Sequence, residues 1–181
     1  MQVVSGPEGR QKVHYQAPPA ETIDQEMHQF LEWFNHPPAL DGLLRSAMAH
    51  LWFVTIHPFE DGNGRLARVI ADLALAQMEG TGQRFYSVSA HIQQDRNRYY
   101  DVLERTQKGK LEITDWLTWF IDAFNRAVDA AMDHSQAVLQ KASFWQRFDE
   151  EPLTARQKNI LNRFMDGFEG KLTSQKWAAL G

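Results

Sequence analysis

Two stretches of helical periodicity meet at one polar interruption near the middle of the chain, and this arrangement constrains the fold more than any other feature. The first stretch predicts a helix over residues 43–56, because four of its residues recur on one helix face: Leu44, Met48, Leu51 and Thr55. The residues HPFEDGNG break this pattern, and helix is predicted to resume at about Gly64 and to end at Gly80. Apolar residues surround most of this second helix, which predicts a place in the middle of a domain: Leu66, Val69, Ile70, Leu73 and Leu75.

The N-terminal part of the chain predicts a β-hairpin followed by a helix. Residues 2–5 and 12–16 are short β-like runs on either side of the turn formers GPEGR. A helix is expected to start at Thr22, with Gln25 completing a capping box, and to stop at Asn35 before a proline pair.

Further helices follow and make the fold class mainly α. They are predicted over residues 92–107 and 115–140, the second with Thr114 as its N-cap. We expect residues 1–148 to form one domain with a helical core and a single small hairpin.

Residues 149–181 differ in character from what precedes them. After a polar linker, Thr154 is placed to cap a helix through Phe164, with Gln157 at the capping-box position. A turn and a second short helix from Thr173 follow, which is how a helix-turn-helix or winged-helix-like domain begins. The recognition helix would come next, and residue 2 already lies in a strand, so we expect the chain to be cut at both ends.

Composition excludes several classes of protein. The chain of 181 residues has a formal net charge of −4 and no cysteine, so it has no disulfide framework and no thiolate metal site. The charge is not that of a protein that coats nucleic acid, and the lack of cysteine fits the cytoplasmic location that we expect. No apolar run approaches the roughly 20 residues that cross a bilayer, so no membrane contact is expected.

The polar interruption combines residue types that bind phosphate. Gly62, Asn63 and Gly64 stand where the helix begins, so backbone N–H groups can converge beside the positive end of the helix dipole. Such an anion cradle suits a phosphate. Arg65 and Arg68 follow on the same side, and two guanidinium groups indicate a di- or triphosphate tail.

Other residues of the same stretch add a metal ligand and a base. Asp61 is the candidate ligand for Mg²⁺, which commonly takes one or two carboxylates plus phosphate oxygens. His57 is the only neutral base in the loop, and histidine, with an ordinary pKa of about 6.5, suits general-base work on a hydroxyl. Phe59 can anchor the loop in the core. The structural alternatives are a plain DGNG turn, a helix-capping histidine and arginines paired with Asp72.

The run HPFEDGNGRLAR resembles the signature of the Fic (filamentation induced by cAMP) family, HxFx[D/E]GNGRxxR, at every defined position. The resemblance covers roughly residues 1–140. It implies an α-helical core in which the motif at 57–68 spans a loop and the start of a central helix, with a β-hairpin flap at residues 2–16. It also implies a protein adenylyltransferase, which transfers AMP from ATP to a hydroxyl side chain of a target protein and releases pyrophosphate.

The resemblance assigns a role to each position of the motif. His57 is the implied general base, Asp61 the implied Mg²⁺ ligand and Phe59 the implied loop anchor. The implied phosphate-binding residues are Gly62, Asn63, Gly64, Arg65 and Arg68. Among these, the glycine-rich nest would hold the α- and β-phosphates, and the second arginine would reach the γ-phosphate.

A nucleoside pocket and a docking strand are also implied. Relatives often carry a YYxxL helix turn beside the nucleoside, which corresponds to Tyr99, Tyr100 and Leu103, with Gln107 one turn on. Tyrosines at helical spacing are as often core, so core packing stays open as the alternative. The flap would hold a segment of an unknown target protein through main-chain pairing.

Several points stay open. The family's inhibitory helix, with the pattern [S/T]xxxE[G/N], is not found: residues 22–27 (TIDQEM) have the spacing but end in methionine. This inhibitory helix would lie upstream, come from a separate antitoxin, or be absent.

The fold also supports phosphoryl, other nucleotide or phosphocholine transfer and removal of AMP, although Gly64 stands where the Doc-type branch has lysine. An alternative function of another kind is a nucleotide-sensing regulator that binds DNA through residues 149–181. The oligomeric state is also open, and a homodimer is one possibility.

Overall fold

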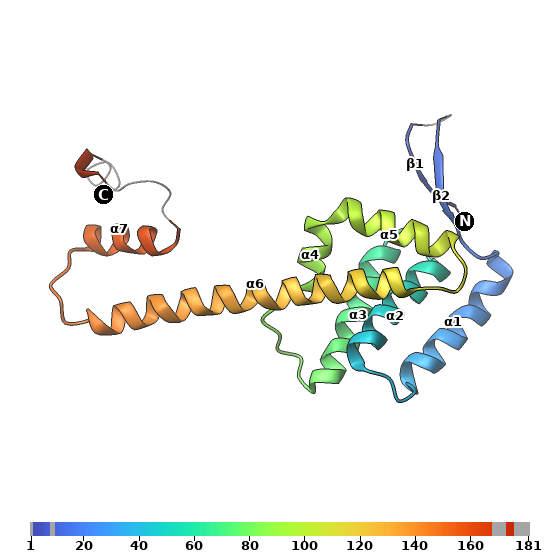
Figure 1. The fold of residues 1–181 in the computed structure, drawn as a ribbon, viewed down its shortest axis with the longest axis horizontal. Coiled ribbons are helices and arrows are strands. Elements are labelled where there is room, and N and C mark those ends of the chain that lie inside the picture. The colour runs from blue at the N-terminus through green and yellow to red at the C-terminus, as the bar shows by residue number, and fades with distance from the viewer. Residues whose placement is uncertain (1, 8–9, 168–172, 176–181) are drawn as a thin grey trace. The chain divides into compact units, whose positions relative to one another are not determined.

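The computed structural model describes residues 2–7, 10–167 and 173–175, and these residues form one hairpin and seven α-helices (Figure 1). The chain divides into two compact units, Met1–Val128 and Asp129–Gly181. This boundary falls inside a helix, whereas the predicted linker follows residue 148, and the assignment of two domains stays a prediction. No helix in the described ranges has the length and apolar character needed to cross a membrane.

The hairpin has the predicted bounds. β1 (Gln2–Ser5) and β2 (Lys12–Gln16) pair antiparallel. α1 (Ala20–Asn35) ends where predicted but starts earlier, and the capping box at Thr22 is wrong. The hydroxyl of Thr22 donates to the carbonyl oxygen of Pro19 at 2.9 Å instead. Proline fixes its own φ near the helical value, so the helix starts directly after it.

The two helices around the polar interruption are confirmed. α2 (Gly42–Ile56) is capped by the Asp41 carboxylate, and α3 (Asn63–Glu79) ends at Gly80, which adopts the left-handed conformation. The prediction that α3 is buried around most of its circumference is wrong. Its buried face is made mainly of small residues, which let it approach α2 closely: Ala67, Ala71, Ala74 and Leu75. Several large apolar residues point outward: Leu66, Val69 and Leu73.

The single helix predicted over residues 92–107 is two helices. α4 (Val88–Gln94) starts earlier, because the Ser87 hydroxyl accepts from a backbone N–H of its first turn. The chain breaks at Asp95, and α5 (Arg96–Lys108) follows. α5 contacts β2, so the hairpin stands beside this helix (Figure 1).

α6 (Thr114–Arg147) is longer than predicted, and Thr114 is its first residue rather than its N-cap. Its first half closes the core of the first unit with buried residues: Trp116, Trp119, Phe120, Ala123 and Ala127. The indole N–H of Trp116 donates to the Ala47 carbonyl oxygen at 2.8 Å, which links α6 to α2.

In the second unit, α7 (Ala155–Met165) has the predicted capping box between Thr154 and Gln157. The indole N–H of Trp145 on α6 donates to the Asn162 amide oxygen at 2.9 Å, and holds α7 against the end of α6. The short helix expected from Thr173 lies largely outside the described residues, so the helix-turn-helix stays a prediction.

Candidate active site

His57 ends α2 in an unusual backbone conformation. Its φ of 53° and ψ of 56° make it the only non-glycine residue with positive φ in the described part of the chain. Strain of this kind is often retained at functional sites. The Nδ1 atom lies 3.3 Å from the carbonyl oxygen of Val54. Because a carbonyl oxygen only accepts, we assign the proton to Nδ1, which leaves the lone pair of Nε2 free to take a proton.

The loop after His57 is held by the Asn63 side chain, which is 2% exposed. Its amide oxygen accepts from the Phe59 N–H at 3.0 Å, and its amide nitrogen donates to the Phe59 carbonyl oxygen at 2.6 Å. The ring of Phe59 is 49% exposed and contacts Phe53 with a centroid separation of 6.4 Å. The expected burial of this ring in the core is therefore wrong, and the loop is anchored through the Phe59 backbone.

The start of α3 has the backbone of an anion site. Gly62 is the N-cap with φ of 86°, a conformation that favours glycine. The first N–H groups of a helix have no intrahelical acceptor, and here they belong to Asn63, Gly64 and Arg65. A Cβ atom added at Gly64 would meet no atom within 4 Å, so the space above the first turn is open to a ligand.

Two oppositely charged side chains at this site, Asp61 and Arg65, pair with each other. Arg65 Nη2 lies 2.9 Å from Asp61 Oδ2, and their side chains are 72% and 89% exposed. An ion pair this exposed contributes little, so it opens at small cost. The described residues hold no group of three or more metal-ligating side chains. Asp61 therefore fits Mg²⁺ only where phosphate oxygens and water complete the coordination.

Arg68 is half-buried and forms no hydrogen bond or ion pair with any residue that the structure describes, so its guanidinium is available to an anion. The structural alternative, a direct ion pair between Arg68 and Asp72, is not formed. The Asp72 carboxylate lies 3.4 Å from Arg84 Nη2 and accepts from the Ser89 hydroxyl at 3.4 Å. Burial still raises the pKa of Asp72, against the opposing effects of Arg84, Ser89 and Arg68.

Behind Arg68 lies a buried histidine that the sequence pattern did not single out. His50 is fully buried, and its Nε2 atom lies 3.1 Å from the Tyr99 hydroxyl. Burial, and then the charge of Arg68, lower the pKa of His50 to about 3, so its ring is neutral at physiological pH. In the sequence, a single histidine within the apolar run of α2 could have indicated a buried ring. The sequence does not indicate which residues that ring contacts.

The predicted nucleoside residues divide into two groups. Tyr99 and Leu103 are 2% and 6% exposed, so core packing holds for both. Tyr100 is 49% exposed, and the amide of Gln107 donates to the Thr55 hydroxyl at 3.2 Å. A nucleoside-binding role for these residues stays a prediction.

Three elements converge just before His57. The Tyr15 hydroxyl of β2 donates to the Thr55 carbonyl oxygen at 2.8 Å, and Gln107 of α5 reaches the hydroxyl of the same threonine. The hairpin and α5 therefore meet α2 two positions before the candidate base. No local pattern indicates this contact, because it joins residues 40 positions apart in sequence.

Comparison with known proteins agrees with this geometry. Residues 3–75 match the Fic/DOC family, so this part of the chain is similar to members of that family. The protein adenylyltransferase Fic of Nematostella vectensis is 32% identical over 116 residues, which are 62% of this chain and 25% of the relative. Its counterpart in Aedes aegypti is 31% identical over 105 residues, which are 57% of this chain and 19% of the relative. The chain thus spans about a quarter or less of these relatives.

A solved structure shows the same fold. The crystal structure of a Fic family protein from Desulfovibrio desulfuricans G20 aligns with a TM-score of 0.61 at 22% sequence identity. The alignment covers 96% of this chain and 46% of the other. The fold is therefore the mainly α Fic fold with a two-stranded hairpin.

Proposed function

We propose that the chain is a protein adenylyltransferase, which transfers AMP from ATP to a hydroxyl side chain of a target protein and releases pyrophosphate. The observation that carries the proposal is that one short loop joins a histidine, the candidate base, to an open helix N-terminus, the candidate phosphate site. Nε2 of His57 makes no hydrogen bond to a described residue, the first turn of α3 is open above Gly64, and Arg68 makes no hydrogen bond or ion pair among the described residues. Relatives that bear the name protein adenylyltransferase support the choice of AMP.

In this mechanism His57 works on the acceptor. Its Nε2 takes the proton of the target hydroxyl as the oxygen attacks the α-phosphorus, and an oxygen–phosphorus bond forms. The bond between the α-phosphorus and the bridging oxygen breaks, and pyrophosphate leaves with the electron pair. A positioned base contributes about 10²–10⁴-fold in rate.

The other residues of the loop bind the donor. The N–H groups at the start of α3 and the guanidinium of Arg68 would stabilise the charge that develops on the phosphates. When bound, Mg²⁺ would neutralise charge on the leaving pyrophosphate. Asp61 would hold the ion, and Arg65 would turn to the phosphate tail once the pair between them opens.

The acceptor is expected to reach His57 along the hairpin. Each strand of a two-stranded sheet has an unpaired edge, which can take up an extended segment. The bond from Tyr15 to Thr55 places β2 beside the end of α2, next to His57. Tyr100 and Gln107 lie on α5 and are the residues proposed to face the nucleoside.

The position of the transferred label tests the proposal. The chain is incubated with cell lysate, Mg²⁺ and ATP labelled at either the α- or the γ-phosphate. We expect protein labelling from the α-label alone and none with His57→Ala. Labelling from the γ-phosphate would assign phosphoryl transfer instead. Equal α-labelling by the wild type and His57→Ala would remove His57 from the chemistry and refute the mechanism.

A further inference from the structure

A hollow of about 640 Å³ lies between β2 and α5 in the first unit, and none of its lining residues belongs to the motif loop. Four cationic and two anionic side chains line it: Lys12, Arg98, Arg105, Lys108, Asp101 and Glu104. The whole chain has a net charge of −4, so the charge of this hollow is opposite in sign to that of the chain. A concave site of excess positive charge attracts anionic groups.

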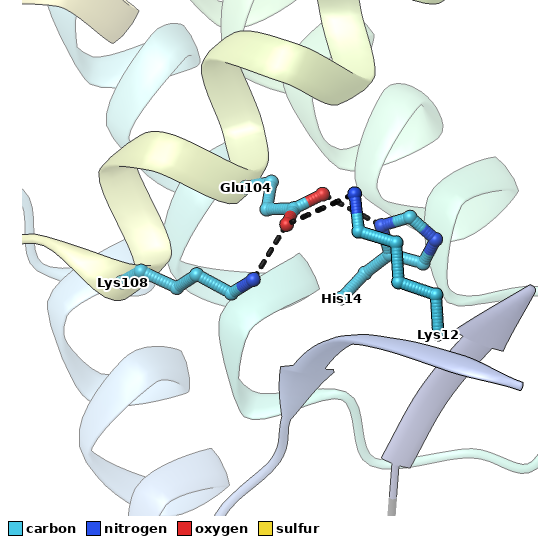
Figure 2. A network of polar contacts seen from close by, with 4 residues as sticks. All are labelled: Lys12, His14, Glu104 and Lys108. Atoms are coloured by element: carbon cyan, nitrogen blue, oxygen red, sulfur yellow. Dashed lines mark hydrogen bonds and ion pairs between the residues drawn. The ribbon is translucent and has the colours of Figure 1, made fainter.

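Glu104 is one of the residues that line the hollow, and its contacts link the hairpin to α5. Figure 2 shows Lys12 and His14 reaching from β2, and Lys108 from α5, to the same carboxylate. The His14 Nδ1 atom lies 2.6 Å away, Lys108 Nζ 2.5 Å and Lys12 Nζ 4.0 Å. The hydrogen bonds from Lys108 and His14 lower the pKa of Glu104 to about 2. These contacts join the strand to the helix beside the hollow.

Two arginines of α5 that line the hollow do not pair with Glu104. Arg98 and Arg105 stand two turns apart on one side of α5, about 10 Å along the helix axis. Arg98 makes no hydrogen bond or ion pair within the described ranges. Arg105 has a contact of 4.0 Å with Asp115, and both side chains are mostly exposed. Both guanidinium groups can therefore bind a carboxylate through two parallel hydrogen bonds.

We propose that this hollow binds acidic side chains of the protein segment that pairs with the hairpin, so that the target segment is acidic as well as hydroxyl-bearing. The inference rests on the proposed function and names the substrate class. Main-chain pairing with a strand reads no side chains, whereas charges beside the strand do select among segments. Lys12 belongs to β2 itself, so a segment on the hairpin lies within reach of the hollow. Asp101 and Glu104 disfavour a densely charged nucleic-acid backbone.

Peptide binding tests the inference without ATP. Two fluorescent peptides, each with one central threonine flanked by either glutamate or glutamine, are titrated with the full chain and followed by anisotropy. We expect the glutamate peptide to bind about fivefold to tenfold more tightly, with a difference that shrinks as salt is raised. Arg98→Glu with Arg105→Glu should abolish this preference, and the double change to glutamine should leave an intermediate one. Both substituted positions are exposed, so the thermal unfolding temperature of each double variant should equal that of the wild type.

The matched control is Lys158→Glu with Arg163→Glu. These residues lie exposed on α7, in the other unit, and the change in net charge is the same. The preference for the glutamate peptide should survive in this control. Equal binding of both peptides by the wild type, or a preference that survives in the Arg98/Arg105 variant, would overturn the inference. So would tighter binding of a single-stranded oligonucleotide that the same variant loses.

A second readout separates this inference from the proposed function. With α-labelled ATP, we expect faster AMP transfer to the glutamate peptide than to the glutamine peptide. Equal transfer to both would overturn the acidic specificity and leave the adenylyltransferase standing. The remaining outcome is a preference for the glutamate peptide in binding that the Arg98/Arg105 variant loses, while the wild type transfers no AMP to either peptide. That outcome would support acidic recognition by the hollow and count against the proposed function.

Discussion

Acid should destabilise the protein through His50. This side chain is fully buried, and its pKa is lowered to about 3 from an ordinary value of 6.5. As the pH falls, the unfolded chain therefore takes up this proton before the folded chain does. The stability is present above a pH of about 6.5 and is lost progressively as the pH falls from there towards about 3. One proton corresponds to about 1.4 kcal/mol per pH unit, so about 2 kcal/mol is lost between about pH 7 and about pH 5.

Urea unfolding of the wild type and His50→Gln over this pH range measures the effect. The glutamine amide can still reach the Tyr99 hydroxyl but does not titrate. The variant should be less stable at neutral pH, because the imidazole also packs against Trp116 and Phe120. Its further loss of stability towards about pH 5 should nevertheless be smaller than that of the wild type by about 2 kcal/mol. Other titrating groups are common to both proteins and cancel. Equal losses in the two proteins would refute a buried neutral His50.

Five further predictions concern the loop and the first turns of α3. Arg68→Ala should slow AMP transfer by about 10²–10³-fold, measured with α-labelled ATP, and a rate like that of the wild type would contradict its role on the phosphates. Asn63→Ala should lower the free energy of unfolding by about 1–3 kcal/mol in urea, because two backbone groups of the loop lose their partner. Gly62→Ala should cost about 1 kcal/mol through its positive φ. Gly64→Ala should instead keep the stability and weaken ATP binding in calorimetry, and unchanged binding would mean that no phosphate approaches there. Chelation of Mg²⁺ should stop transfer, and Asp61→Asn should raise the Mg²⁺ concentration that transfer requires; no effect of either would exclude a metal at Asp61.

Local patterns predicted much of the fold. The hairpin, α2, α3 and α7 lie within a residue or so of their predicted bounds, because turn formers, Gly80 and the Thr154 capping box act on their own neighbours in sequence. Where tertiary packing decided the outcome, the predictions were wrong. The large apolar residues of α3 indicated a buried helix, but close packing on α2 selected the alanines and left Val69 and Leu73 outside.

In the candidate site, too, local patterns were predictable from the sequence and contacts between distant segments were not. The residues of the loop stand together in sequence, so their roles could be proposed from the motif alone. The contacts that position them join distant segments: Tyr15 with Thr55 and His50 with Tyr99. No periodicity or motif marks these pairs, since each depends on how the hairpin and α5 pack against α2. The exposed ring of Phe59 likewise depends on Asn63 having taken over the anchoring of the loop.

The division of labour within the loop is tested most directly by the His57→Ala variant, with its affinity for ATP in the presence of Mg²⁺ measured beside its rate of AMP transfer. Nε2 of His57 is assigned to the acceptor hydroxyl, whereas Arg68 and the start of α3 are assigned to the donor. We therefore expect an affinity within about twofold of the wild type and a transfer rate lower by about 10²–10⁴-fold. A loss of ATP affinity as large as that of Arg68→Ala, or transfer at the rate of the wild type, would contradict this assignment.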